Sequence, residues 1–490
     1  MEPLARSFIG GEHKMLVGGA WVAPRGGESL VVEDPATGKP VTRIAAGDGR
    51  DLDLAVAAAR RAFDQGPWPT MSGLERAGYL LKLADLVEAN AGELSLIEAI
   101  DVGQPITLAR HANINAAVTI LRYASGWAGR IYGDTIPAGA NGDWHIYTLR
   151  EPCGVVGQIV PWNVPFSMAV SKMASALAAG CCVIIKPAEL TSLSTLRLGQ
   201  LVEQAGVPEG VVNIVTGAGP DIGAAMVSHR GIDKIAFTGS TETGKSILKD
   251  AASTLKRVTL ELGGKAPVLI LRDADIDKAV AATAGGIFFN SGQTCTAGSR
   301  VLVDPSIAAE VAEKLTARAQ EIKVGSPLDP VTQMGPLVSR RQQERVESYI
   351  ASGIEEGAEL LAGGERIASD GYFCAPTIFR HARPSMRMVR EEIFGPVLTL
   401  IEMDSDALDD LAREANDTEY GLSASIWTRD ISKGHRLARK IKAGSVRINT
   451  SGNIDPAVPF GGYKHSGFGR ERGREGVELY TELKAITVAL

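Results

Sequence analysis

Short apolar runs alternate with segments of helical spacing along most of the chain. The first series of runs comprises residues 155–160, 181–185, 211–215, 234–237 and 258–262. The second series begins at Pro267 and comprises residues 268–271, 300–303, 397–401, 422–427 and 445–448. Helical periodicity between runs is clearest at residues 166–179 and 192–204. Because near-continuous apolar strands joined by helices are typical of parallel sheets covered on both faces, the pattern predicts two α/β units.

Two segments depart from this alternation. Residues 132–150 combine the turn pair Asn141-Gly142 with β-prone residues, which predicts a hairpin. Residues 480–488 predict a further strand near the end of the chain. Exposed strand edges are usually covered, and a second subunit could cover these.

Composition narrows the class of protein. The 490 residues exceed what one hydrophobic core usually serves, and 45% hydrophobic with 22% charged residues is an ordinary globular balance. The formal net charge is −6 without a long basic run, which argues against nucleic acid or a membrane surface as a partner. Neither a basic-then-apolar opening nor a bilayer-length apolar run is present in the sequence, so we expect a cytoplasmic protein.

The five cysteines suggest neither a disulfide framework nor a metal site. They are Cys153, Cys181, Cys182, Cys295 and Cys374. Their spacing contains no CxxC pair, and we expect no bound metal.

Cys295 is the candidate nucleophile. It follows an apolar helical run and has small or polar neighbours, including Gly292, Thr294 and Thr296. A thiol reacts as its thiolate, which requires a polar or electropositive pocket. A lone intracellular cysteine is more often a small buried hydrophobe, so residues elsewhere must decide between these interpretations.

Polar groups follow the strands of the first series, and parallel sheets bind ligands at these strand ends. Asn163 follows the first run, and Lys186 with Glu189 follows the second. Residues 238–245 form a turn that opens a helix and suits a pyrophosphate, although they match neither the three-glycine fingerprint nor the P-loop. Glu261 precedes two glycines and could act as a general base. Taken singly, Asn163 is better explained as a turn amide, and Lys186 with Glu189 as a surface ion pair. Glu261 could be merely a solvated loop acid.

Taken together, the motifs are far more specific. The chain resembles the aldehyde dehydrogenase superfamily, in its non-acylating, NAD(P)-dependent branch, over nearly its whole length. The stretches that carry the resemblance are residues 161–166 (PWNVPF), 186–189 (KPAE), 237–240 (FTGS), 260–265 (LELGGK), 292–295 (GQTC), 391–396 (EEIFGP) and 459–462 (PFGG).

The resemblance implies three structural parts. Residues 1–130 and 151–261 would form a Rossmann-type NAD-binding domain, and residues 262–463 an α/β catalytic domain. Residues 131–150 and 480–490 would form a small β bridging unit through which subunits assemble as dimers or tetramers.

The resemblance also implies catalytic roles. Cys295 would attack the aldehyde, and the Asn163 amide with the Cys295 backbone N–H would hold the oxyanion of the thiohemiacetal. Glu261 would activate the water that hydrolyses the resulting thioester. Lys172 and Glu471 would pass the proton outward.

The expected cofactor is NAD. By the same resemblance Lys186 and Glu189 would hold the adenosine ribose. The pyrophosphate would be held by Trp162 and by Ser240, in the turn that also contains Thr238 and Gly239. Glu392 and Phe394 would contact the nicotinamide ribose and ring. The Glu189 carboxylate would repel a 2′-phosphate, so NAD is favoured while NADP stays possible.

The expected substrate is a small aldehyde. The residues that the resemblance places along the substrate tunnel are Val164, Met168, Ser171, Phe289, Thr294, Thr296, Ile454 and Phe460. This lining is apolar and shows no obvious arginine for a substrate carboxylate. It has too few aromatic faces to cage a quaternary ammonium, so we expect medium-chain aliphatic or arylalkyl aldehydes.

Three other functions stay open at this point. A CoA-acylating dehydrogenase is disfavoured by Glu261, because that branch typically lacks this base. A catalytically silent structural protein is disfavoured by the joint presence of Cys295, Glu261 and Asn163. A thiol esterase would need a histidine beside the cysteine, and none is placed there by a motif.

Overall fold

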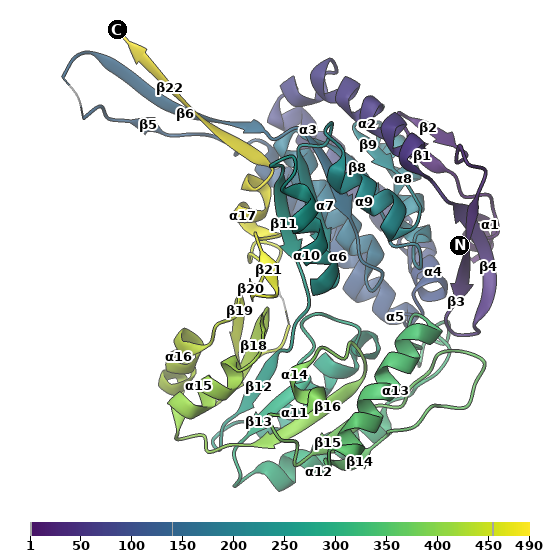
Figure 1. The fold of residues 1–490 in the computed structure, drawn as a ribbon, viewed down its shortest axis with the longest axis vertical. Helices are drawn as coiled ribbons and strands as arrows, with labels where there is room; N and C mark the ends of the chain where they lie inside the picture. The colour runs from purple at the N-terminus through teal and green to yellow at the C-terminus, as the bar shows by residue number, and fades with distance from the viewer. Residues whose placement is uncertain (1, 140, 453–454) are drawn as a thin grey trace.

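The computed structural model describes residues 2–139, 141–452 and 455–490. They form two large sheets surrounded by helices, together with a three-stranded sheet that leaves the body of the molecule (Figure 1). The predicted α/β class, with parallel strands joined by helices, is confirmed.

The first sheet has the strand order β2-β1-β9-β8-β7-β10-β11-β21. In chain order its strands are β1 (Met15–Val17), β2 (Ala20–Val22), β7 (Val155–Ile159), β8 (Cys182–Lys186), β9 (Val212–Ile214), β10 (Lys234–Thr238), β11 (Arg257–Glu261) and β21 (Gly467–Phe468). The strands from β9 to β11 run parallel, and β1, β2 and β21 extend the sheet in antiparallel pairings. Every residue of β7 and β8 is buried, so helices cover both faces.

Helix α7 is the helix that matters most for the site. It begins with Pro165 at its first position, where a proline ring suits the helical φ angle, and it ends at Gly180 with a φ of 94°. Nearly all of its residues are buried, because it packs against β7 and β8 on one side and α3 and α6 on the other. The helices and short turns around this sheet are α1 (Glu2–Ile9), α2 (Gly49–Asp64), η1 (Trp68–Thr70), α3 (Gly73–Ala89), α4 (Ala91–Asp101), α5 (Ile106–Leu108), η2 (Ala109–Ile114), α6 (Asn115–Ala128), α7 (Pro165–Ala179), α8 (Leu193–Ala205), η3 (Gly219–Gly223), α9 (Ala224–Ser228) and α10 (Thr241–Ala251).

The second sheet has the order β14-β15-β16-β13-β12-β18-β19. Its strands are β12 (Pro267–Ile270), β13 (Arg300–Val303), β14 (Glu359–Ala362), β15 (Thr377–Arg380), β16 (Val397–Glu402), β18 (Ser423–Trp427) and β19 (Ser445–Ile448). Its helices and turns are α11 (Ile276–Phe288), η4 (Phe289–Gly292), α12 (Ala308–Glu321), α13 (Arg340–Glu355), α14 (Arg387–Arg390), α15 (Leu408–Asn416) and α16 (Ile431–Lys440). The pattern missed β14 and β15, because each is only four residues long and β14 is a partly exposed antiparallel edge strand.

The three-stranded sheet outside the body contains the two segments that did not follow the alternation of apolar runs and helices in the sequence. Strand β6 (Trp144–Pro152) pairs with β5 (Thr135–Ile136) and, along its whole length, with β22 (Thr481–Ala489). The predicted hairpin and terminal strand are therefore present, and they project together from the molecule (Figure 1). The remaining elements are α17 (Gly473–Glu478) and two small strand pairs, β3 (Ser29–Asp34) with β4 (Lys39–Ala45) and β17 (Tyr420–Gly421) with β20 (Tyr463–Lys464). Among the described helices, none has the length and apolar character needed to cross a bilayer.

Candidate active site

Cys295 lies in the loop after α11 and η4, directly behind a strained turn. The φ angles of Asn290, Ser291 and Gly292 are 48°, 57° and 73°. Residues other than glycine seldom adopt such left-handed angles, and two of them in succession are held only where the surroundings fix them. The turn thereby redirects the chain from the helix to Cys295.

Side chains of this loop supply the fixation. Ser291 Oγ donates to the carbonyl of Gly335 at 2.8 Å, and Gln293 Oε1 accepts from the backbone N–H of Val338 at 2.9 Å. Both side chains are buried. Cys295, two residues after Gln293, is therefore presented at a defined position.

Asn163 lies against the same loop. Its Nδ2 donates to the carbonyl of Gln293 at 2.8 Å, and Asn290 Nδ2 donates in return to the carbonyl of Asn163 at 2.9 Å. The loop after β7 is thus locked to the cysteine loop, although 130 residues separate Asn163 from Gln293. An amide nitrogen carries two N–H groups, so one remains for a further acceptor near Cys295.

Glu261, the last residue of β11, is buried beside this loop. Neither of its carboxylate oxygens has a hydrogen-bond partner among the described residues. A β-carbon on Gly461 would lie 2.8 Å from Glu261 Oε1, and one on Gly264 would collide with the carbonyl of Cys295. Because glycine has no β-carbon, the backbone can approach closely at both positions, and Glu261 and Cys295 share one site.

The surroundings of Glu261 include a buried ion pair. Lys172 of α7 pairs with Glu471, and the Lys172 side chain is fully buried. Burial, and then the charge of Glu471, raise the pKa of Glu261 well above its ordinary value, while Lys172 and Arg470 oppose this rise. The structure therefore brings Lys172, Glu471 and Glu261 into one electrostatic group.

The electrostatics of Cys295 do not favour the thiolate in the way expected of a polar or electropositive pocket. Burial, followed by the charges of Glu392 and Glu261, raises the pKa of the Cys295 thiol to about 12. Burial and these carboxyl groups, to which Glu471 adds, therefore oppose formation of the thiolate.

The predicted ribose-binding pair lies at the end of β8. Lys186 Nζ contacts Glu189 Oε2 at 2.9 Å, and Lys186 is buried. Burial opposes ionisation of Glu189, but the Lys186 charge and backbone N–H groups outweigh it and lower the pKa of Glu189. Glu189 is therefore an ionised acceptor.

The turn at residues 238–240 opens α10. Ser240 caps this helix, because its Oγ accepts from the Thr243 N–H at 3.2 Å. Thr238 Oγ1 is buried and has no hydrogen-bond partner among the described residues. A helix N-terminus beside an unused hydroxyl suits an anionic group.

The residues predicted to contact the nicotinamide ribose and ring also lie near the cysteine. Glu392 accepts from the N–H of Gly264 at 2.9 Å, and burial raises the pKa of Glu392 to about 7. The rings of Trp162 and Phe394 meet edge to face with centroids 5.2 Å apart.

Comparison with known proteins decides the family. A sequence model of the aldehyde dehydrogenase family matches residues 21–486. The chain belongs to the aldehyde dehydrogenase family. It is 46% identical to the protein DhaS of Bacillus subtilis over 99% of this chain and 97% of that protein. It is 45% identical to mitochondrial benzaldehyde dehydrogenase of Antirrhinum majus over 97% of this chain and 89% of that protein.

Solved structures agree. An aldehyde dehydrogenase from Bacillus cereus in complex with NAD+ superposes with a TM-score of 0.98 at 46% identity, covering 100% of this chain and 99% of that one. The protein is therefore an NAD-dependent aldehyde dehydrogenase, and the predicted cofactor is confirmed.

The site of this aldehyde dehydrogenase fits NAD. The unpartnered hydroxyl of Thr238 and the N-terminus of α10 can receive the pyrophosphate. The ionised Glu189, held by Lys186, can accept from ribose hydroxyls.

The side chains predicted to line the substrate tunnel come from separate elements. Val164 and Met168 at the start of α7 are half-buried, whereas Ser171 is fully buried. The other half-buried members are Phe289, Thr294, Thr296 and Phe460. Ile454 lies outside the described residues.

Two arginines near Cys295 escaped the motif analysis. Burial lowers the pKa of the guanidinium groups of Arg447, on β19, and Arg472, and a Cys295 thiolate opposes this at both, as Glu471 does at Arg472. Arg472 belongs to the charge-rich stretch at residues 470–475, and the simplest interpretation of such a stretch in a sequence is a solvated face. Nothing in that pattern distinguishes it from its neighbours, because the distinction depends on which side chain turns inward.

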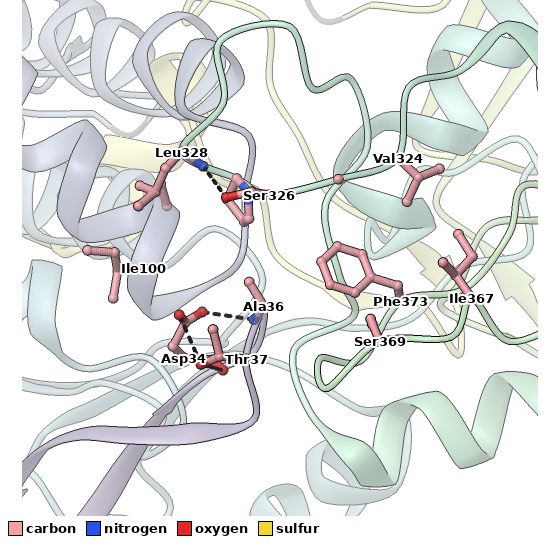
Figure 2. Close-up of a pocket in the computed structure, with 13 residues that line it drawn as sticks. Asp34, Ala36, Thr37, Ile100, Val324, Ser326, Leu328, Ile367, Ser369 and Phe373 are labelled. Carbon is pink, nitrogen blue, oxygen red and sulfur yellow. Dashed lines mark hydrogen bonds between the residues drawn. The ribbon is translucent and has the colours of Figure 1, made fainter.

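A separate cavity of about 410 Å³ lies between the β3–β4 turn, the end of α4 and the loop at residues 324–328. In Figure 2 its polar groups satisfy one another, with Asp34 bound to the Ala36 N–H at 2.8 Å. None of the predicted site residues lines it, so it is not the catalytic site.

Proposed function

We propose that Cys295 is the nucleophile, Asn163 the oxyanion donor and Glu261 the general base of aldehyde oxidation to a carboxylic acid. The observation that supports this most strongly is their convergence. Asn163 is locked to the cysteine loop, and Glu261 is buried beside it with both oxygens unpartnered. Active sites characteristically hold such strained turns and unsatisfied buried groups.

The first step begins with loss of the Cys295 thiol proton to water, and the resulting thiolate attacks the aldehyde carbon as the carbonyl π bond breaks. The carbonyl oxygen becomes an oxyanion, held by the free N–H of the Asn163 amide and the backbone N–H of Cys295. When bound, NAD supplies the hydride acceptor and a positive ring that offsets the carboxylates around the thiol. Since Glu392 and Glu261 raise the pKa of the thiol, neutralising either carboxylate favours the thiolate.

The last step is hydrolysis of the Cys295 thioester. Glu261 takes a proton from water, and its raised pKa makes it a stronger base once it is ionised. The buried Lys172–Glu471 pair lies next to it and can accept the proton.

For the substrate we propose medium-chain aliphatic or arylalkyl aldehydes, such as hexanal and phenylacetaldehyde. The half-buried Val164, Met168 and Phe289 support an apolar body, and relatives of this chain are named for benzaldehyde and retinal. A kcat/KM series tests the proposal. Clear preference for betaine aldehyde over hexanal and phenylacetaldehyde would refute it.

Replacing the nucleophile tests the mechanism. Cys295→Ala should abolish oxidation of every aldehyde. NAD binding, measured by quenching of protein fluorescence, should stay intact. Oxidation by this variant above the background rate would exclude Cys295 as nucleophile.

We further propose assembly as a homo-oligomer, a dimer or a tetramer, through residues 131–150 and 480–490. The paired strands β6 and β22 project from the body with exposed Trp144, Leu483 and Val488. A cytoplasmic location stays a prediction from the sequence.

A further inference from the structure

Residues 470–474 contain three arginines that have different surroundings. Arg470 donates to the carbonyls of Gly462 and Gly469, at 3.2 and 2.6 Å. Arg474 is exposed and pairs with Glu478 at 2.6 Å. Both guanidinium groups are therefore accounted for by neighbouring protein groups. Arg472 is different.

The backbone directs Arg472 toward the predicted tunnel. Glu471, the preceding residue, exchanges two backbone hydrogen bonds of 2.7 Å with Phe460. The Arg472 guanidinium carbon then lies 5.8 Å from the centre of the Phe460 ring. A cation over an aromatic face is weakly stabilised, but an aromatic ring does not replace a counter-ion.

Carboxylates within the protein do not pair with Arg472. Among the described residues, no Asp or Glu oxygen lies within 4.0 Å of its guanidinium. Glu471 binds Lys172, and Asp455, in the loop before Phe460, accepts from the N–H of Ala457 at 2.8 Å. Arg472 is half-buried and has no carboxylate partner among the described residues, so an anion from outside the protein can pair with its guanidinium.

Arg447 approaches the same region from the second sheet. Strand register aligns Arg447 with Ser425 and Ser425 with Val268. Registered residues share a face, and Gly298 of the cysteine loop packs against Val268 on that face. Arg447 therefore lies on the sheet face that carries the cysteine loop, and burial lowers the pKa of its guanidinium while a Cys295 thiolate would raise it.

We propose that Arg472, together with Arg447, binds an anionic group at the end of the aldehyde remote from its carbonyl. This inference rests on the proposed function, because it assumes that Cys295 receives the carbonyl carbon. The substrate class is then an aldehyde with an apolar body and a distal carboxylate or other anion. Guanidinium groups suit this role, since they donate two parallel hydrogen bonds to a carboxylate.

Matched pairs of substrates separate charge from size. The pairs are hexanal with 6-oxohexanoate and benzaldehyde with 4-carboxybenzaldehyde. In at least one pair the wild-type enzyme should show a kcat/KM at least tenfold higher for the anionic member, and added NaCl should reduce that preference. Equal or lower kcat/KM for both anionic members would overturn the inference.

Variants then assign the preference to these side chains. Arg472→Gln and Arg447→Gln should each reduce kcat/KM for the preferred anionic aldehyde by roughly tenfold or more, with less than about threefold change for its neutral partner. Arg474→Gln, two residues away on the exposed face, is the matched control and should change neither value. If Arg472→Gln lowers both members of a pair equally, the guanidinium acts on the thiol, and the inference is wrong.

The two proposals fail differently. Good oxidation of neutral aldehydes without preference for anions overturns only the inference about the arginines. Absence of aldehyde oxidation with NAD for every substrate, in a folded wild-type enzyme, overturns the proposed function itself. Melting temperatures of the variants within about 2 °C of the wild type exclude misfolding as the cause of a loss.

Discussion

Replacing Glu261 by glutamine separates the two halves of the reaction. Glutamine has nearly the size of glutamate. Both oxygens of Glu261 lack hydrogen-bond partners among the described residues, so the substitution removes no hydrogen bond to them. General-base catalysis contributes about 10²- to 10⁴-fold, so we expect kcat to fall by roughly that factor. The steps before hydrolysis do not use this base, and about one NADH per subunit should still form in a burst.

The same substitution should stabilise the protein at high pH. The pKa of Glu261 is raised in the folded state, so the folded protein holds this proton more tightly than the unfolded chain does. Stability therefore falls as pH rises from the unfolded pKa of about 4.3 through the raised folded value. Each unit of that rise corresponds to about 1.4 kcal/mol, a penalty that glutamine removes.

Two measurements check this reasoning. Stopped-flow absorbance of NADH should show a burst followed by slow turnover, and differential scanning fluorimetry should show Glu261→Gln melting above wild type by a margin that grows with pH. The difference in melting temperature should vanish near pH 4, where the Glu261 side chain of the wild type is protonated and neutral, as glutamine is. Wild-type steady-state turnover in the variant would mean that another group is the base, and loss of the burst would place Glu261 in an earlier step.

Three further predictions concern the oxyanion, the cofactor and the oligomer. Asn163→Ala should slow NADH formation in a single turnover by about 10²-fold, corresponding to about 3 kcal/mol, and an unchanged rate would exclude the amide as donor. Glu189→Ser should raise the ratio of kcat/KM with NADP to that with NAD by roughly tenfold or more, because a charge that repels a 2′-phosphate is lost; a constant ratio would contradict this role. Leu483, which is 58% exposed on β22, should be covered by another subunit, so Leu483→Asp should reduce the mass measured by light scattering, whereas a monomeric wild type would refute assembly.

The sequence pattern predicted most of the strands but not all of them. Alternation of apolar runs and helices correctly predicted the strands from β7 to β11 and five strands of the second sheet. It missed β14 and β15, which have short or exposed sequences. A periodic pattern becomes recognisable only over several residues, and strands of four residues are too short to show one.

The predicted strand ends also indicated where the site lies. In a parallel sheet the carboxyl ends lie along one edge, so polar residues after β7, β8, β10 and β11 were expected to be neighbours. The motifs also identified the family, because many separate matches in one order are hard to obtain otherwise.

The sequence by itself thus determined the α/β class, the family and the candidate residues. Tertiary structure alone decided which of them touch: Lys172 and Glu471 form an ion pair across 299 residues of chain, and Arg472 turns toward Phe460 while Arg474 faces solvent. It also decided that burial, together with nearby carboxyl groups, raises the pKa of the Cys295 thiol, where the motif suggested a polar or electropositive pocket. Local sequence patterns reflect backbone preference and burial. The electrostatics of a site depend on charged groups from several elements, and only the folded chain brings these groups together.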